Sequence, residues 1–339
     1  MPFQGKHLPD ATGSGTAGRG EFAIDPMTQA VSFLAPAFAP KFLVLYAFVL
    51  SAVAIHFRGR VRHRFLRQLT DHSTLLAPVN CLLYLFSAVG NKPRVPVEKF
   101  PELKVITENW QVFRDEGLAL YRAGHVKASK EYDDIGFNSF FRRGWKRFYL
   151  SWYGDPHPSA AKLCPKSVEI LRQVPSLKAA MFALLPDGGK LLAHRDPYAG
   201  SLRFHMGLAT PNSDKCRIYI DGEPYSWRDG EAIVFDETYI HSAINESGMD
   251  RLILFADVER PMTFAPARWL NRLFAHILMR ASTTKNEDGE RVGALNKAFG
   301  VVYRGRVKMK ALKKANRRLY YAIKYVALGG LLAAFVVWA

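Results

Sequence analysis

The chain has 339 residues, 49% of them hydrophobic, so it can form one large domain or two smaller ones with a sizeable core. A formal net charge of +17 indicates an anionic partner: nucleic acid, an anionic membrane surface or an acidic substrate. The three cysteines, Cys81, Cys164 and Cys216, form no CxxC pair, which argues against a disulfide framework or a thiolate zinc site and favours a reducing compartment.

The N-terminal part of the chain divides into a leader and two apolar segments. Residues 1–26 are rich in glycine and lack apolar periodicity, which predicts a disordered leader or tag. Residues 27–72 contain the apolar run 41–57 followed directly by five arginines, which predicts a membrane anchor with a basic juxtamembrane segment. Residues 73–97 begin with an apolar run broken by a proline and an asparagine, which favours a helix lying in the membrane interface.

The C-terminal residues 301–339 repeat the pattern of the N-terminal anchor. The basic run KMKALKKANRR precedes the apolar run 320–339, which predicts a second membrane anchor. Both basic clusters lie on the side of the apolar runs that faces the middle of the chain, so the positive-inside rule places that middle part in the cytoplasm. For all three apolar runs, buried core helices are the alternative.

Residues 98–300 are predicted to form one folded domain that begins with helices and continues with strands. Apolar spacing predicts helices over 101–127 and 166–173, and an apolar run predicts a strand near 179–185. After Asp187, short strands recur at roughly 8–12-residue intervals with Asp-Gly turns between them, as in sandwiches and barrels. These strands are LRFHMGLA, CRIYI, YSW, AIVF, YIHSAIN and RLILFADV. The pattern predicts a mainly β fold (α+β) in which helices support a jelly-roll core, the double-stranded β-helix.

Two histidines and an aspartate make the candidate metal site. His194 and Asp196 are separated by one residue in HRDPYAGSLRFHMGL, so in an extended segment both point to one face. His241, near the start of a strand farther along the chain, is the best third ligand. Two histidines and one carboxylate form the facial arrangement of non-haem Fe(II) oxygenases, which leaves coordination positions open. In a chain with ten histidines, however, such a trio also arises by chance.

Three further polar residues strengthen the case for a site. Arg251 heads the apolar strand RLILFADV, where its guanidinium could hold a carboxylate in a bidentate fork. Arg203 and His205 share one face of SLRFHMGL, so we expect this polar face to line a cavity and the apolar face to pack against a second sheet. A surface salt bridge is the commoner explanation for each arginine alone. Their combination with the metal residues favours a functional site.

Several stretches resemble one known family. HRDPYAGSLRFHMGL, WRDGEAIVFDETYIHSAIN and the arginine of RLILFADVERP are similar to the aspartyl/asparaginyl β-hydroxylase family of Fe(II)/2-oxoglutarate dioxygenases, and within it to the bacterial lipid A 2-hydroxylases. The likeness extends upstream to FPELKVITENW and GFNSFFRRGWKRFYLSWYGDPHPSA, and covers approximately residues 75–300. Residues 98–300 are therefore expected to be a catalytic dioxygenase domain.

The resemblance implies a role for each candidate residue. His194, Asp196 and His241 would bind Fe(II). Arg251 would hold the distal carboxylate of the co-substrate 2-oxoglutarate, and Arg203 and His205 would help to bind it. The family's animal aspartyl hydroxylases lack the carboxylate of the metal triad, whereas Asp196 is present in this chain.

The resemblance also implies a reaction and a substrate. The expected enzyme uses 2-oxoglutarate and O2 to hydroxylate the 2-position of a secondary acyl chain of lipid A at the cytoplasmic face of the bacterial inner membrane. The net charge of +17 and the stretch RRGWKRFY, whose rings could lie at headgroup level, favour an anionic membrane lipid.

Other readings of the chain remain open. An ornithine-lipid 2-hydroxylase is a close alternative, and a peptidyl aspartyl/asparaginyl β-hydroxylase a more distant one. No nucleic-acid partner is expected, because a disproportionate share of the basic residues adjoins the apolar runs rather than forming a patch on the β domain. A jelly roll that only bound metal or lipid would have no need of a carboxylate clamp at Arg251.

Overall fold

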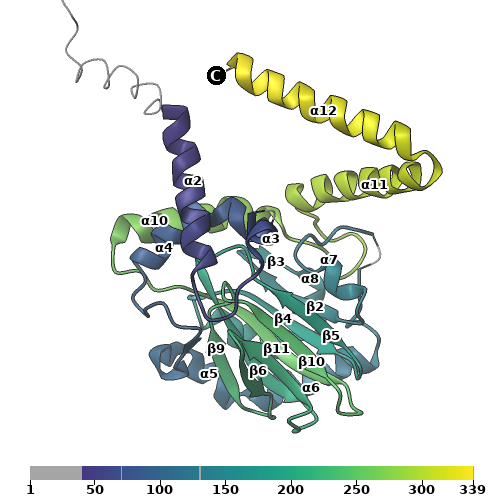
Figure 1. Cartoon of the computed structure of the whole chain (residues 1–339). Coiled ribbons are helices and arrows are strands. Elements are labelled where there is room, and N and C mark those ends of the chain that lie inside the picture. Colours follow the sequence, from purple (N-terminus) through teal and green to yellow (C-terminus); the bar gives the residue numbers. More distant parts are fainter. Residues whose placement is uncertain (1–39, 70, 130, 339) are drawn as a thin grey trace, which may run out of the picture. The chain divides into compact units, whose positions relative to one another are not determined.

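The computed structural model describes residues 40–69, 71–129 and 131–338 (Figure 1). The predicted leader, residues 1–26, lies outside the described residues. The chain divides into two units, Met1–Leu45 and Tyr46–Ala339. Of the first unit the structure describes the beginning of helix α2 (Pro40–His56), and the second unit holds the other described elements.

Eight consecutive strands form a jelly roll of two antiparallel sheets. They are β4 (Leu177–Leu185), β5 (Lys190–His194), β6 (Ser201–Ala209), β7 (Cys216–Ile220), β8 (Glu223–Ser226), β9 (Ala232–Phe235), β10 (His241–Asn245) and β11 (Arg251–Glu259). The larger sheet also contains β1 (Arg94–Val95), β2 (Lys146–Trp152) and β3 (Asp155–Pro156). The strand orders are β1-β9-β6-β11-β4-β2-β3 and β5-β10-β7-β8, so the chain alternates between the sheets as in a jelly roll. The predicted fold is confirmed, and the predicted strands are correct to within two residues at each end.

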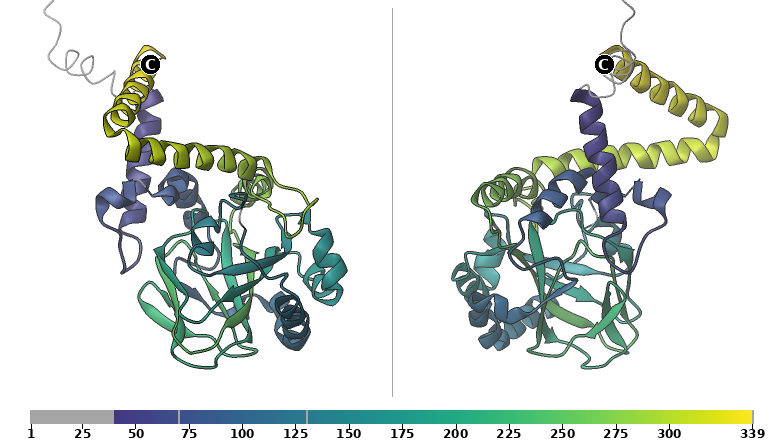
Figure 2. Two further views of the ribbon diagram at one scale, coloured as in Figure 1. Left: turned by 90° about the vertical axis from the view of Figure 1, so that its right-hand side faces the viewer. Right: turned by 60° about the vertical axis from the view of Figure 1, so that its left-hand side comes forward.

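The larger sheet lies between a layer of helices and the smaller sheet. Leu202, Phe204 and Met206 of β6 belong to one hydrophobic cluster with Phe113 and Leu120 of α6 (Trp110–Arg122). In both views of Figure 2, the blue and teal helices beside the lower part of the strands lie on one side of them. The prediction that the apolar face of β6 packs against the second sheet is therefore wrong. Strand alternation separates two faces but does not say which layer covers each of them.

The covering helices match the sequence pattern. The helix predicted over 101–127 is present as η4 (Pro101–Leu103), α5 (Lys104–Glu108) and α6, and the helix predicted over 166–173 is α9 (Pro165–Arg172). The short helices α7 (Asn138–Phe141) and α8 (Pro158–Leu163) precede and follow β2 and β3. Gly117 allows α6 to approach the sheet, because a Cβ there would lie 3.2 Å from Phe182 and 3.3 Å from Leu252.

The segment before the domain packs on the jelly roll. It contains α3 (Phe65–Leu69), η2 (His72–Leu76), α4 (Ala77–Leu85) and η3 (Val97–Lys99). Helix α4 buries Ala77, Asn80, Leu83 and Tyr84 but exposes Leu82 and Leu85. Strand β1 pairs with β9, so the larger sheet already begins within the predicted 73–97 segment. The predicted 73–97 segment therefore contains the helix α4, and its place at a membrane interface stays a prediction.

The stretch RRGWKRFY contributes to the core rather than to a headgroup layer. Trp145, Phe148 and Tyr149 are buried, and Arg147 forms a buried ion pair with Asp134. The rings belong to β2 and the turn before it, where alternate side chains enter the two faces of a sheet that is covered on both sides. The prediction that these rings lie at headgroup level is wrong.

The C-terminal part of the described chain is helical. It contains α10 (Ala265–Phe274), the π-helical turn η5 (Ala275–Met279), α11 (Ala294–Ala315) and α12 (Arg317–Trp338). Within residues 40–338, as far as they are described, no helix combines the length and the apolar character needed to cross a bilayer. The two membrane anchors stay predictions.

A candidate metal centre and anion pocket

The three predicted metal ligands meet at one point. His194 ends β5 and His241 begins β10, and these neighbouring strands pair His241 directly with His194. Asp196 follows two residues after His194. One ligand atom from each of the three residues lies within 4.8 Å of the others, and the two imidazole ring centroids are 4.2 Å apart. Strand register therefore brings together residues that are separated by almost fifty positions in the chain.

Both histidines are held through Nδ1, which leaves Nε2 of each ring for the metal site. Nδ1 of His194 lies 2.6 Å from the carbonyl oxygen of Leu192, and Nδ1 of His241 lies 3.0 Å from that of Tyr239. A carbonyl only accepts, so Nδ1 carries the proton in each ring and Nε2 presents its lone pair. Burial lowers the pKa of His241 to about 3, which keeps this imidazole neutral at physiological pH.

Asp196 is oriented by Arg203, which sits among three carboxylates. The Arg203 guanidinium lies 2.9 Å from Asp196 and 2.8 Å from Asp257, and it also pairs with Glu237. Asp257 faces Arg203 across the β11–β6 ladder. Arg203 was predicted to bind a co-substrate; the structure engages its guanidinium with these acids, and the contact with a co-substrate stays a prediction. Glu237 and Asp257 were missed, although an aspartate inside the apolar strand RLILFADV is a signal of a buried partner.

Arg251 is a buried cation without a compensating carboxylate in the described part of the chain. The residue is only 2% exposed, and among the described residues its guanidinium makes no ion pair and its Nε has no hydrogen-bond partner. The guanidinium carbon lies 4.3 Å from the ring centroid of Trp227. Burial lowers the pKa of Arg251 to about 10, so the group stays charged at neutral pH.

The unsatisfied donors continue from Arg251 toward the metal residues. Neither ring nitrogen of His205, nor Nε1 of Trp227, has a hydrogen-bond partner in the described chain, although all three atoms are buried. The His205 ring lies 6.0 Å from Trp227 and 5.1 Å from Phe235, whose ring is 5.7 Å from that of His241. Native proteins rarely leave buried polar groups unpaired, so these groups indicate a site for an anionic, hydrogen-bonding ligand. Arg251, His205 and Trp227 are referred to below as the anion pocket.

A short segment that begins in the last turn of α2 holds both loops that carry the metal residues. This bridging segment, residues 55–61, receives a hydrogen bond of 2.7 Å from Arg195, the residue between His194 and Asp196, through the carbonyl of Ile55. Its Arg58 pairs with Asp236 at 2.6 Å and donates to Thr238 at 2.6 Å, in the loop just before His241. The amide of Arg60 donates to Asp221 at 2.8 Å.

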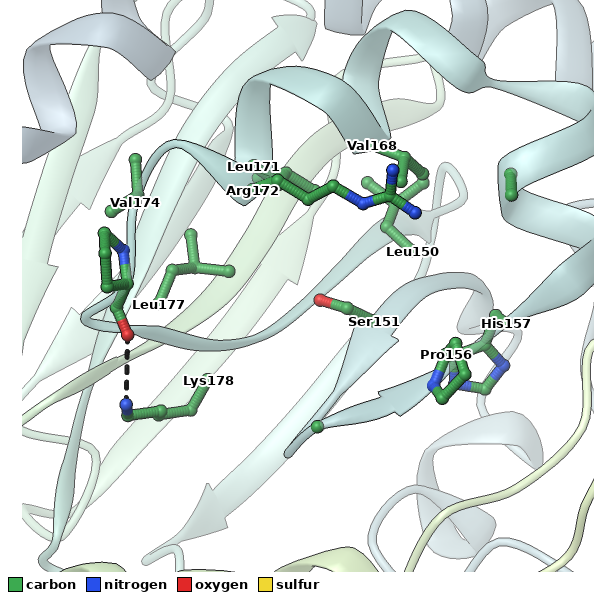
Figure 3. Close-up of a pocket in the computed structure, with 13 residues that line it drawn as sticks. Leu150, Ser151, Pro156, His157, Val168, Leu171, Arg172, Val174, Leu177 and Lys178 are labelled. Atoms are coloured by element: carbon green, nitrogen blue, oxygen red, sulfur yellow. Dashed lines mark hydrogen bonds between the residues drawn. The ribbon is translucent and has the colours of Figure 1, made fainter.

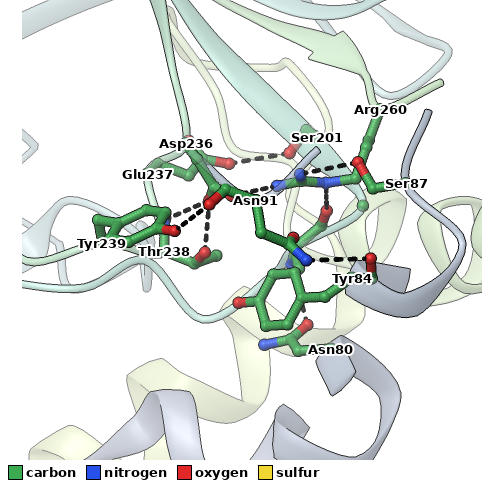
Figure 4. A network of polar contacts seen from close by, with 12 residues as sticks. Asn80, Tyr84, Ser87, Asn91, Ser201, Asp236, Glu237, Thr238, Tyr239 and Arg260 are labelled. Carbon is green, nitrogen blue, oxygen red and sulfur yellow. Dashed lines mark hydrogen bonds and ion pairs between the residues drawn. The ribbon is translucent and has the colours of Figure 1, made fainter. Parts of the chain in front are cut away.

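Arg58 lies between two aromatic rings and shares its carboxylate partner with a second arginine. Its guanidinium carbon lies 3.8 Å from the ring centroids of both Tyr84 and Tyr239. Arg260 approaches the same Asp236 at 2.7 Å (Figure 4). Burial alone would raise the pKa of Asp236, but the two arginines hold it well below its usual range. This pairing could not be predicted from residue types, because Arg58 stands in a row of similar arginines.

We expect Arg58→Gln to weaken both the fold and the metal site. Asp236 would lose one of two buried cationic partners, which lowers the free energy of unfolding at neutral pH by about 3 kcal/mol. The depressed pKa of Asp236 contributes stability that is complete above the pKa of the unfolded carboxyl and is lost as the pH falls toward the folded value. The difference in stability between wild type and variant should therefore begin to shrink below about pH 4. Loss of a residue that positions the metal ligands without itself contacting the metal typically weakens metal binding by about 10- to 100-fold. Chemical denaturation and Co(II) absorption titration measure the two effects.

Arg60→Gln is the matched control for Arg58→Gln. Arg60 lies two residues away, but its ion pair with Glu223 is exposed, so its removal should change stability by less than about 1 kcal/mol. An Arg58 variant that bound Co(II) as tightly as the Arg60 variant would show that the bridging segment does not position the ligands.

A separate cavity lies on the helix-covered side of β2. It has a volume of about 270 Å³ and is lined by Leu150, Val168, Leu171 and Leu177, with Arg172 and Lys178 among its polar neighbours (Figure 3). Lys178 already pairs with Glu259 at 2.8 Å. None of the metal or anion-pocket residues lines this cavity, which belongs to the packing of α8 and α9 on the sheet.

Comparison with known proteins identifies the family. Residues 107–261, which include all six predicted site residues, match the aspartyl/asparaginyl β-hydroxylase family. The chain is 32% identical over 201 residues to an ornithine lipid ester-linked acyl 2-hydroxylase of Rhizobium tropici, covering 58% of this chain and 71% of that protein. The chain belongs to the aspartyl/asparaginyl β-hydroxylase family. The family predicted from the sequence is thus confirmed.

Other relatives of this β-hydroxylase family member align over shorter parts. Human aspartyl/asparaginyl beta-hydroxylase is 27% identical over 164 residues, which is 47% of this chain but only 21% of the human protein. Among solved structures, a Pseudomonas putida prolyl-4-hydroxylase aligns with a TM-score of 0.30 and 16% identity over 46% of this chain and 88% of that one. The jelly-roll assignment rests on the strand order described above.

Proposed function

We propose that this chain is an Fe(II)- and 2-oxoglutarate-dependent dioxygenase that hydroxylates the 2-position of a secondary acyl chain of lipid A at the cytoplasmic face of the inner membrane. One observation carries the proposal: a His–Asp–His cluster within 4.8 Å and a buried arginine without a carboxylate partner among the described residues line the same interior of a jelly roll. A metal ion would bind to the His–Asp–His cluster, and an anionic co-substrate would pair with the buried arginine.

The donor set fits iron(II). Two neutral imidazoles present Nε2, and Asp196 supplies an oxygen on the same side, the facial set that leaves positions open for co-substrate and oxygen. Iron bound there supplies oxygen activation coupled to decarboxylation of 2-oxoglutarate, which is the chemistry that inserts oxygen into an unactivated C–H bond. The protein's part is to orient the ligands through Arg203, Leu192 and Tyr239 and to hold the substrate C–H nearby.

The anion pocket fits a dicarboxylate that reaches from the metal to Arg251. Arg251 would bind the distal carboxylate as a bidentate, charge-assisted pair, with His205 and Trp227 as further donors. A carboxylate in this place removes the penalty of a buried unpaired cation, so binding of the co-substrate also stabilises the fold.

Two observations bear on the lipid substrate. The net charge of +17 and the predicted anchors support lipid A, a diphosphorylated lipid, as the substrate and the inner membrane as the proposed location. Ornithine lipid is the second candidate, because the Rhizobium tropici relative carries that substrate in its name. Both candidates share the same chemistry, 2-hydroxylation of an ester-linked acyl chain.

Mass spectrometry of membrane lipids from cells that express wild type or His241→Ala separates the candidates. We expect one additional oxygen on an acyl chain of lipid A in cells with the wild-type protein, and no such addition with the variant. An additional oxygen found only on ornithine lipids would replace lipid A by the second candidate. Unmodified lipids in both samples would contradict a lipid substrate and favour a peptide one.

A further inference from the structure

Helix α10 carries two parallel stripes of opposite character on its exposed side. Trp269, Leu273 and Ile277 follow one another at intervals of four residues and are 65%, 38% and 58% exposed. Arg268, Arg272 and His276 form a second exposed stripe at the same spacing, displaced by one residue. At 3.6 residues per turn these stripes lie side by side along the helix and its continuation in η5.

The third side of α10 is fixed to the domain near the metal site. Asn271 is buried, its Nδ2 donates to the carbonyl of Gly200 at 3.0 Å, and its own carbonyl accepts from the Tyr198 hydroxyl at 3.0 Å. Both partners belong to the loop that follows Asp196. The exposed stripes are therefore presented by a helix that is anchored to a metal-ligand loop.

The apolar surface continues from α10 onto α4. The rings of Phe264 and Phe86 lie 4.8 Å apart, and α4 exposes Leu82 and Leu85. Helices α10 and α4 lie next to one another in Figure 1, and α4 also reaches α2, where Cys81 approaches the carbonyl of Ser51. These residues make one apolar face, referred to below as the α10–α4 face: Leu82, Leu85, Phe264, Trp269, Leu273 and Ile277.

The exposed charged residues of α10 are basic. Residues 260–286 contain four arginines and one lysine but no aspartate or glutamate; of these arginines, Arg260 is buried and pairs with Asp236. Arg272 reaches back to Glu259 at 2.7 Å, whereas Arg268 donates to the backbone carbonyl of Met262. Exposed tryptophan and aliphatic side chains flanked by arginines are typical of helices that lie in an anionic bilayer interface, where rings and chains enter the acyl boundary and cations meet phosphates.

We propose that the α10–α4 face docks the catalytic domain onto an anionic membrane surface, with Trp269, Leu273 and Ile277 inserted below the headgroups. The inference rests on the proposed function in that it names the surface through which a lipid substrate would be approached. It is independent of the predicted terminal anchors, because every residue of the face lies in the folded body. Docking would hold the loop that contains Tyr198 and Gly200, and with it Asp196, next to the lipid surface.

Spin-label depth measurements on the full-length chain test this docking. A nitroxide is attached at Leu273→Cys in a Cys81→Ser background, Cys81 being the native cysteine that is not buried. The labelled protein is reconstituted into vesicles of phosphatidylcholine with or without phosphatidylglycerol. The measured quantity is the ratio of the label's collision rate with oxygen to its collision rate with a water-soluble nickel complex. We expect this ratio to be at least about threefold higher in anionic vesicles than in neutral ones. The matched control is Met249→Cys, an exposed apolar position in the β10–β11 turn, whose label should stay accessible to the nickel complex in both.

The outcomes separate docking from its alternatives. Equal nickel accessibility of the Leu273 and Met249 labels in anionic vesicles would overturn the proposal. Equal depth of the Leu273 label in neutral and anionic vesicles would overturn the preference for anionic lipid. Dipolar broadening between Leu273 labels without lipid would show that a second copy of the chain covers this face instead. Because no turnover is measured, docking and hydroxylation can each fail while the other stands.

Discussion

Purified protein carrying His241→Ala is expected to lose metal binding and hydroxylation together. The substitution removes one of two imidazoles from a three-residue donor set, so the remaining His194 and Asp196 cannot fill one face of an octahedral ion. The effect on metal affinity should exceed the roughly 10- to 100-fold weakening that follows when only a supporting residue of a metal site is changed. Co(II) titration followed by absorption measures binding without any turnover, and 2-oxoglutarate-dependent oxidation of the lipid measures activity.

Two further variants and a control define this result. Asp196→Ala and His194→Ala should behave like His241→Ala, because each supplies one ligand atom to the same cluster. His125→Ala is the control, since His125 pairs with Glu287 at the surface of the domain, away from the cluster. Retained Fe(II)-dependent activity in the His241 variant would refute the proposed triad.

Arg251→Gln is expected to act in opposite directions on stability and on co-substrate binding. The wild-type guanidinium is buried without a carboxylate partner among the described residues, and burial lowers its pKa to about 10. A lowering of this size corresponds to a destabilisation of the fold by about 3 kcal/mol. The penalty is present at any pH below about 10 and is relieved as the pH rises through that value. Without co-substrate the variant should therefore unfold at a higher temperature than wild type.

With co-substrate the order should reverse. Loss of a buried charge-assisted pair weakens binding by about 2–4 kcal/mol, so the KM for 2-oxoglutarate should rise roughly 30- to 1,000-fold while kcat changes much less. Addition of 2-oxoglutarate should raise the melting temperature of wild type but not that of Arg251→Gln. Arg228→Gln, which removes a surface ion pair with Asp214, should leave both quantities unchanged. An unchanged KM in the Arg251 variant would place the co-substrate elsewhere.

Local pattern was enough to predict much of this chain. The two-residue period of apolar side chains and the Asp-Gly turns located seven of the eight strands of the jelly roll, all but β5, since both signals depend only on neighbouring residues. The HxD spacing and His241 were likewise recognisable from residue types, and the motifs around them indicated the family. The stripes of α10 also follow from local periodicity, because each repeats at intervals of four residues.

Partners distant in the chain were decided only by the tertiary structure. Arg58 and Asp236 are 178 positions apart, and Arg203 meets Asp257 through the register of β6 and β11. The residue types around Trp145 and Phe148 show aromatic and basic side chains side by side, but not that both faces of their sheet are covered. Equally, no pattern distinguishes Arg251, which lacks a carboxylate partner in the described chain, from Arg203, which has three. The sequence determined which residues could form a site. Strand register and layer order decided which of their charges were neutralised and which were left for a ligand. The physical reason is that electrostatic pairing depends on distances that only the folded chain defines.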